Sequence, residues 1–221
     1  GRSVSKISIP FLAESWKKND LEKIDDMYVR SSVSQYAVGL LIFIGLLVNI
    51  DNIFRLLPDI YSKSAAVIVL IGFGNLVSGS AGVNGVVLST SSLYRYQTWL
   101  MFILIGLFVG TSLIFIPLFG ITGAALASMI SNIIYSMLGV LLTGKRFGLW
   151  PYNILHLKMT LVGLAALAAG YFIPQMPLIS DIIARSLLVT VIFTAGVWFW
   201  KLSDDLNGVA ESLMDRFRRK R

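Results

Sequence analysis

The chain contains no cysteine and only a small share of charged residues. Without cysteine, neither disulfides nor thiol chemistry contributes to the fold or to function. Charged residues make up 14% of the sequence, hydrophobic residues make up 56%, and the mean hydropathy is +0.75. A soluble domain of this size would aggregate with such a composition. The chain is therefore predicted to be an integral membrane protein.

The longest uncharged stretch runs from Tyr96 to Gly144, without any Asp, Glu, Lys, Arg or His. It is about twice as long as one helix needs to cross a ~30 Å hydrocarbon core at ~1.5 Å per residue. A turn is predicted near its middle, because Pro117 can end a helix and Gly120 can adopt a positive φ. The stretch therefore predicts two membrane spans joined by a short apolar loop.

Small and polar residues form a stripe along the second of these spans. Ala124, Ser128, Ser131 and Tyr135 follow one another at i, i+4, i+7 and i+11, so they share one helix face. Close helix packing is the favoured interpretation of this face, and a substrate-lining face is the alternative.

The whole sequence predicts an all-α integral membrane protein, because apolar segments of about twenty residues indicate spanning helices rather than barrel strands. Six complete transmembrane helices are expected, at residues 35–57, 64–89, 96–119, 121–143, 154–173 and 182–200. Four regions follow: the end of a preceding span with a cytoplasmic interfacial segment (1–34), a four-helix part (35–153), two additional helices (154–201) and a basic amphipathic tail (202–221).

The basic residues behind the formal charge of +7 lie mainly in the short loops between spans, which favours a membrane topology signal over nucleic-acid binding. Fourteen basic residues lie on one predicted side: Lys17, Lys18, Lys23, Arg30, Arg95, Lys145, Arg146, Lys158, Lys201 and the five between Arg216 and Arg221. The other side holds Arg55, Lys63 and Arg185. The asymmetry predicts that the C-terminus and the amphipathic segment at 11–34 are cytoplasmic.

Two arginines are candidates for binding an anionic group. Arg55 is expected to pair with Asp51 at i, i+4, and the alternative is that it faces a central cavity and meets an anionic ligand. Arg95 stands between Tyr94 and Tyr96, where lipid phosphate is the favoured partner and substrate phosphate is the alternative.

The span at 64–89 is rich in glycine and polar residues, which predicts a pathway-lining or bending helix. Asn75, Ser78, Gly79 and Gly82 share one face, whereas Asn84 lies nearer the other. An amide in lipid is costly unless it is hydrogen-bonded, so both asparagines are expected to point into protein or water.

No set of catalytic or metal-binding residues is apparent. Residues 139–145 match most of a phosphate-binding loop, but Arg146 stands where Ser or Thr would hold Mg²⁺ and a spanning helix stands where a strand is needed. The single histidine, His156, is expected to be structural. The chain is therefore predicted not to be an enzyme and to use no cofactor or metal.

Several local motifs together resemble a known family. They are Ser8-Ile9-Pro10 before a charged segment ending Ile24-Asp25-Asp26-Met27-Tyr28, then Leu57-Pro58-Asp59-Ile60-Tyr61, Ser91-Ser92-Leu93-Tyr94-Arg95 and, most specifically, the proline-glycine turn of residues 116–123 followed by Ala124-Ala125-Leu126-Ala127. Over residues 1 to 201 the chain resembles the C-terminal half of bacterial polysaccharide or oligosaccharide (O-antigen type) flippases of the multidrug/oligosaccharidyl-lipid/polysaccharide exporter superfamily.

That resemblance implies a fourteen-helix transporter of the bacterial inner membrane, of which an N-terminal lobe is missing here. Such proteins pass an undecaprenyl-pyrophosphate-linked glycan to the outer leaflet by alternating access, for lipopolysaccharide and other surface polysaccharides. The last two spans would then flank a lipid groove. Arg55, Asn75, Asn84 and Arg95 are the best available donors to such a substrate.

Two other functions are weighed against this one. A multidrug or cation exporter of the same superfamily needs carboxylates within the membrane, yet no Asp or Glu occurs from Ser64 to Gly144. A membrane glycan polymerase or ligase usually presents a sizeable external loop, whereas the outer loops expected here are short.

Overall fold

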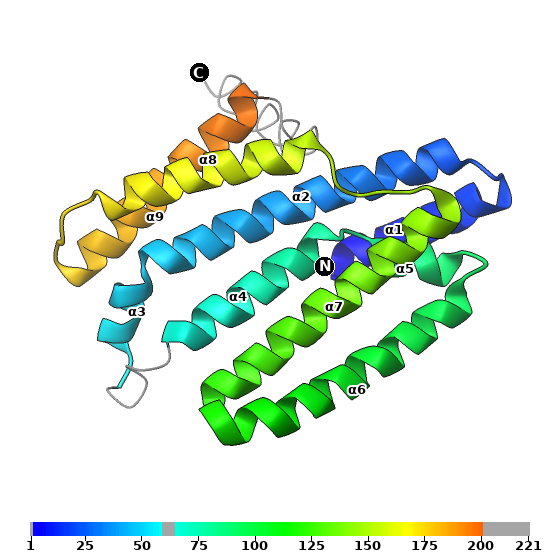
Figure 1. Ribbon diagram of the computed structural model, residues 1–221. Coiled ribbons are helices and arrows are strands. Elements are labelled where there is room, and N and C mark those ends of the chain that lie inside the picture. The colour runs from blue at the N-terminus through cyan, green and yellow to red at the C-terminus, as the bar shows by residue number, and fades with distance from the viewer. Residues whose placement is uncertain (1, 59–64, 201–221) are drawn as a thin grey trace.

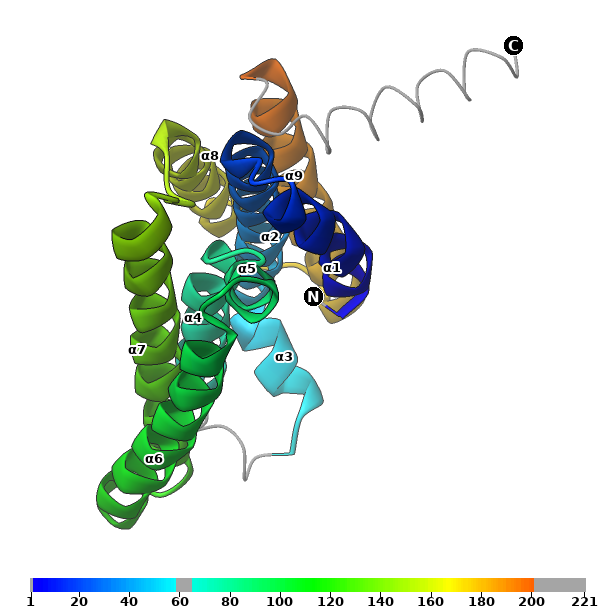
Figure 2. The ribbon, with the colours of Figure 1, turned by 90° about the vertical axis from the view of Figure 1, so that its right-hand side faces the viewer.

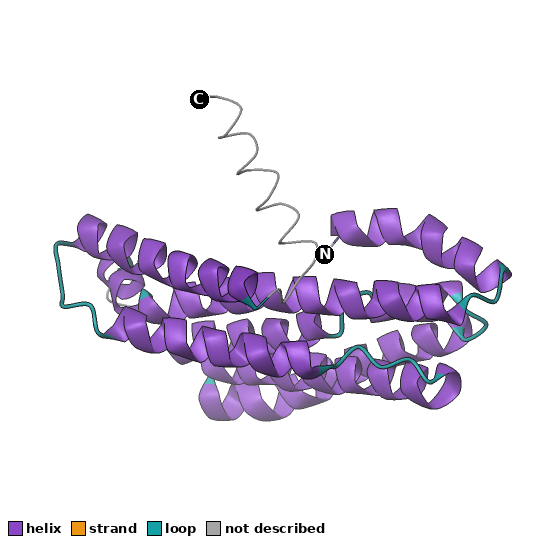
Figure 3. Ribbon diagram, turned by 90° about the horizontal axis from the view of Figure 1, so that it is seen from above, coloured by secondary structure: helices purple, strands orange, loops and turns teal. Residues whose placement is uncertain are grey.

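The chain folds into helices joined by loops (Figures 1 and 3), in a computed structural model that describes residues 2–58 and 65–200. Within those two ranges there are nine helices and no strand, which confirms the predicted all-α fold. The helices are α1 (Arg2–Lys17), α2 (Leu21–Val48), α3 (Ile50–Leu56), α4 (Ala65–Ser80), α5 (Asn84–Thr90), α6 (Tyr94–Phe119), α7 (Ile121–Phe147), α8 (Ile154–Tyr171) and α9 (Leu178–Phe199).

Five helices, α2, α6, α7, α8 and α9, are each long and apolar enough to cross a membrane. α4 and α5 together have the same length and composition but are bent by 46°, so the described residues hold six spans if this pair counts as one span. The chain is therefore a multi-pass membrane protein. Arg95 lies in the first turn of α6 and Lys145 in the last turn of α7, while the two helices join at the opposite end, so both basic residues lie at the same end of the bundle (Figure 1).

The first span differs from its prediction at both ends. Residues 21–34, expected in a surface segment, are the first half of α2, because Ile24 and Tyr28 are fully buried in a cluster with Leu12 of α1. At the other end α2 stops at Val48, and the chain turns at Asn49 into the short helix α3. At about 1.5 Å per residue, α2 is about 42 Å long and exceeds the thickness of the hydrocarbon core.

The bend between α4 and α5 is fixed by a close contact with α2. Gly82 has φ +58, and a Cβ at this position would lie 2.7 Å from the backbone nitrogen of Ser32. On either side, Ser31 Oγ accepts from Val83 N at 3.1 Å and Ser32 Oγ donates to the carbonyl of Ser80. The predicted bending helix is therefore confirmed, with the bend packed against a neighbouring helix.

The turn between α6 and α7 is built on glycine. Gly120 has φ +57 and separates the two helices, as expected. Pro117, however, does not end α6, because the helix continues through it to Phe119. Gly123 then packs directly on the carbonyl of Phe115, which leaves no room for a side chain.

α2 is the central helix of the bundle. Its buried residues share one apolar core with residues of α4, α8 and α9. This core consists of Val33, Ala37, Leu40, Ile44, Val48, Leu76, Met159, Val162, Ala166, Val189, Phe193 and Val197. Glycines allow close approach within this core, as where Gly163 faces Leu40 and Gly170 faces Val48. α6 and α7 form the opposite edge, and α1 and α3 lie on the same side of α4 (Figure 2).

Lys63, Lys201 and the predicted basic tail at 202–221 lie outside the described residues.

Replacing Gly82 with alanine is expected to destabilise the protein strongly, because the new Cβ meets the backbone of Ser32 and φ is unfavourable for an L-residue. A loss of about 2 kcal/mol or more is expected. Gly45→Ala is the matched control, since nothing lies within 4 Å of a Cβ at that position. Thermal unfolding in detergent measures both variants, and equal melting temperatures would contradict the docked bend.

Candidate functional site

The two candidate arginines lie at opposite ends of the bundle, on α3 and on the first turn of α6 (Figure 1). The predicted Asp51–Arg55 ion pair is wrong: Arg55 is exposed and its Nη2 lies 3.4 Å from Gln175 Oε1, a long contact across to the α8–α9 loop. Arg95 is also exposed, and its Nε donates to Tyr94 Oη at 3.2 Å. The structure does not bring these two cations together.

Asn84 is buried at the crossing of three helices. Its Nδ2 donates to Tyr28 Oη of α2 at 2.7 Å and to Thr143 Oγ1 of α7 at 3.1 Å. Its Oδ1 occupies the space in which a side chain at Gly139 would lie. The amide of Asn84 therefore joins α5 to α2 and α7 within the protein. The same contact places residues 139–145 in a packed helix, where they form no phosphate-binding loop.

Asn75 is the candidate whose side chain stays available to a ligand. It is exposed near the middle of the bent α4–α5 span, and its amide has no hydrogen-bond partner among the described residues. Ser78, one turn further on, accepts from Ser136 Oγ of α7 at 3.0 Å.

A second open amide, Asn132 on α7, lies on the same side of the bundle. On α4, Gly74 packs on Met129 of α7 and Gly72 packs on Phe43 of α2, so Asn75 faces neither neighbour. On α7, Asn132 lies about 60° from Met129, which faces α4, and about 100° from Ser131, which contacts Thr111 of α6.

The direction of the two helices decides which side each amide faces. α4 and α7 run in the same direction (Figure 1). We view both helices along their axes from the N-terminal end. In this view Asn75 is rotated clockwise from the direction in which α4 faces α7, and Asn132 is rotated counterclockwise from the direction in which α7 faces α4. In parallel helices these positions are on one side of the pair. We name the surface formed by Asn75, Ser78, Ser128, Asn132 and Tyr135 the α4–α7 polar face.

The residues of the stripe predicted on α7 do not all have the same environment. Ser131 is fully buried against α6, with its Oγ 3.3 Å from Thr111 Oγ1, which is the expected close packing. Tyr135 Oη accepts from Gln97 Nε2 of α6 at 2.8 Å, and Ser128 is bonded by Asn132. Sequence reasoning missed Asn132, although its position one residue after Ser131 places it at the edge of the stripe that faces α4.

A buried ion pair near the N-terminal end of α9 was also missed. Arg185 Nε donates to Asp181 Oδ2 at 2.8 Å, and Asn52 of α3 donates to the same oxygen. The guanidinium also bonds the carbonyls of Gly170 at 3.0 Å and Ile173 at 2.9 Å, which end α8. The i, i+4 spacing of Asp181 and Arg185 is the signal that would have found the pair. All of its bonds are to protein, so Arg185 holds α8, α9 and α3 together.

The only histidine is structural, as predicted. His156 is part of the capping box that begins α8, together with Asn153. Its Nε2 lies 2.9 Å from Ser32 Oγ, so it also ties α8 to α2 beside the α4–α5 bend. Within the described residues no group of three or more His, Cys, Asp or Glu side chains can hold a metal ion.

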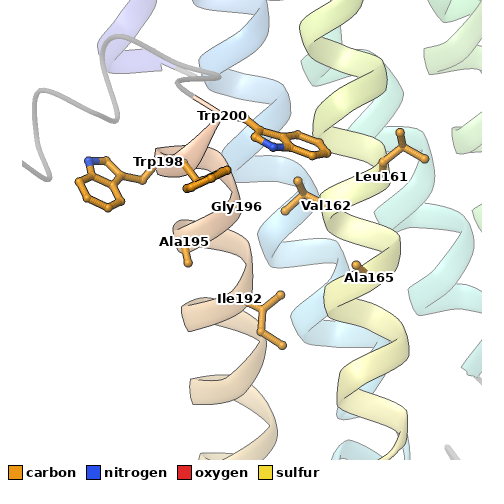
Figure 4. A pocket seen from close by; sticks show the side chains of 9 residues that line it. Leu161, Val162, Ala165, Ile192, Ala195, Gly196, Trp198 and Trp200 are labelled. Carbon is orange, nitrogen blue, oxygen red and sulfur yellow. The ribbon is translucent and has the colours of Figure 1, made fainter.

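An apolar groove lies between the last two helices. It has a volume of about 520 Å³ and is lined from α8 by Leu161, Val162 and Ala165, and from α9 by Ile192, Ala195, Gly196, Trp198, Phe199 and Trp200. The ring of Trp200 extends toward Val162 and Leu161, whereas Trp198 points away from α8 (Figure 4). The lining offers contact to hydrocarbon.

Comparison with models of protein families, with curated proteins and with solved structures finds no match to this chain. The family resemblance seen in the sequence therefore stays a prediction.

Replacing Asn84 with alanine is expected to lower stability by about 1–3 kcal/mol, because Tyr28 and Thr143 lose a buried donor. Arg95→Ala, at an exposed position, is the control and is expected to change stability by no more than about 0.5 kcal/mol. Thermal unfolding measures both. An Asn84 variant with unchanged stability would contradict the structural role of this amide.

Replacing Arg185 with methionine is expected to lower the melting temperature by several degrees, because the Asp181 carboxylate stays buried without its cation. Adding Asp181→Asn to that variant is expected to recover part of the loss. Equal melting temperatures for the single and double variants would show that the pair is not coupled.

Proposed function

We propose that this chain works in a transporter that passes a lipid-linked oligosaccharide from the cytoplasmic to the outer leaflet by alternating access, for cell-surface polysaccharide biosynthesis. The proposed membrane is the bacterial inner membrane, with the C-terminus cytoplasmic. The substrate would be an undecaprenyl-pyrophosphate-linked glycan, and the transporter would include an N-terminal lobe that is not part of this sequence. The transport would involve no covalent chemistry and no cofactor.

The observation that carries the proposal is the α4–α7 polar face. Amides and hydroxyls are costly in lipid unless they meet protein, water or a polar ligand. Asn75 is exposed, and it lies about 15 Å along the helix axis from the first residue of α4. This depth is within the bilayer core rather than at its edge. An open polar surface at this depth suits a pathway for a polar head group.

Two further features fit a substrate with a glycan and a lipid tail. The apolar groove between α8 and α9 matches the chemistry of an isoprenoid chain. No Asp or Glu occurs from Ser64 to Gly144, which suits a neutral or anionic head group and disfavours the multidrug or cation exporter. Neither feature favours a polymerase or ligase.

The proposal is tested with the intact protein in proteoliposomes that contain a fluorescent lipid-linked oligosaccharide. Asn75→Leu is expected to slow translocation on the order of tenfold while the melting temperature stays unchanged, because the exposed amide supports no fold contact. Thr190→Val, which removes an exposed hydroxyl from α9, is the control.

Wild-type protein that moves no lipid-linked oligosaccharide would contradict the proposal. Single replacement of Arg55 and of Arg95 tests the two cations in the same assay, and unchanged translocation would remove each from the site.

A further inference from the structure

Asn75 and Asn132 lie at nearly the same depth in the bundle. Two contacts between α4 and α7 bracket them: Gly74 against Met129, and Ser78 bonded to Ser136. Asn75 is one residue after Gly74, and Asn132 is three residues after Met129. At ~1.5 Å per residue, their positions along the helix axes therefore differ by about 3 Å. Counted from the second contact, they differ by about 1.5 Å. The two side chains therefore form one patch.

The amides of this patch keep free hydrogen-bonding groups. Asn75 has no partner among the described residues. Asn132 uses its Nδ2 on its own helix, donating to the carbonyl of Ser128 at 2.9 Å and to Ser128 Oγ at 3.3 Å, and no bond to its Oδ1 is formed within the described chain. The patch thus offers both donors and acceptors to a ligand.

The patch is also uncharged. Arg95 is the only Lys, Arg, Asp or Glu from Ser64 to Gly144, and it lies on the first turn of α6 at the end of the bundle. A pyrophosphate is best bound by cations, whose charge-assisted hydrogen bonds are about twice as strong as neutral ones. A sugar hydroxyl both donates and accepts hydrogen bonds. A neutral amide can pair with it in both ways, because its oxygen accepts and its nitrogen donates.

On the basis of the proposed function, we propose that the α4–α7 polar face recognises the hydroxyls of the sugar in the lipid-linked glycan, through Asn75 and Asn132, and leaves the phosphates to groups elsewhere. The face would then distinguish a lipid that carries a sugar from one that does not. A site that hydrogen-bonds a hydroxyl discriminates strongly against an analogue that lacks it, because its own polar groups are left unpaired.

Binding of two probes to the intact purified protein tests this assignment: undecaprenyl pyrophosphate that carries one N-acetylglucosamine, and undecaprenyl pyrophosphate without sugar. Wild-type protein is expected to bind the sugar-bearing lipid more tightly, on the order of tenfold. The double variant N75L/N132L is expected to lose that preference, while its affinity for the sugar-free lipid changes less than about twofold. Thr190→Val is the control and is expected to keep the preference.

The absence of cysteine from this chain allows a second measurement that does not depend on the leucine variants folding. Single replacements N75C and N132C introduce the only thiols of this chain, and their labelling by a water-soluble maleimide is followed with each probe, with the wild-type intact protein as the control for thiols elsewhere in it. The sugar-bearing lipid is expected to slow labelling at both positions, and the sugar-free lipid is expected to leave it unchanged.

The alternatives give different results. Equal loss of both affinities in N75L/N132L would assign the face to phosphate or to the lipid as a whole and would overturn the proposal. Unchanged affinities, together with no labelling in any condition, would show that another helix covers the face, which also overturns it. Wild-type protein that binds neither lipid contradicts the proposed transport function itself, so the two failures are distinguishable.

Discussion

The contact between Gly82 and the backbone of α2 is the constraint on which the rest of the bundle depends. It places the α4–α5 bend directly against Ser31 and Ser32, whose hydroxyls satisfy backbone groups on both sides of the break. Backbone groups freed by a bend in a membrane helix must be bonded within the protein. Because the bend is held here, Asn84 reaches Tyr28 and Thr143, and Asn75 is left on the open side of α4.

Polar side chains in this protein divide by what surrounds them. At the end where α2 begins, hydroxyls, an amide and His156 bond to one another across helices, and at the other end Arg185 and Asp181 bond three helices. Between these two bonded layers lies the α4–α7 polar face, where the amide of Asn75 and the Oδ1 of Asn132 form no hydrogen bond within the described residues. Satisfied polar layers rigidify a bundle, whereas open groups at mid-depth are available to a ligand.

The sequence predicts the helical class, the long apolar helices and the glycine turn well, because uncharged length and glycine conformation are local properties. It predicts the site less well. The charged segment at 21–34 continues into α2, since Ile24 and Tyr28 are buried by α1, a contact between separate helices. Likewise Asp51 and Arg55 have pairing spacing but no bond, whereas the Asp181–Arg185 pair forms because Asn52 and two α8 carbonyls surround it. Asn132 follows only from knowing which neighbours lie on each side of α7.

α6 lies at the edge of the bundle and buries only Gln97 and Leu100 of its own residues. None of its residues belongs to either apolar cluster of the described chain. It is attached through the tight turn at Gly120, through contacts with α5 and α7, and through the Gln97–Tyr135 and Thr111–Ser131 hydrogen bonds. A change in the tilt of α6 would therefore leave the central core intact, yet it would move Gln97, which bonds Tyr135 of the α4–α7 polar face. The edge helix is thus mechanically separate from the apolar core but coupled to that face.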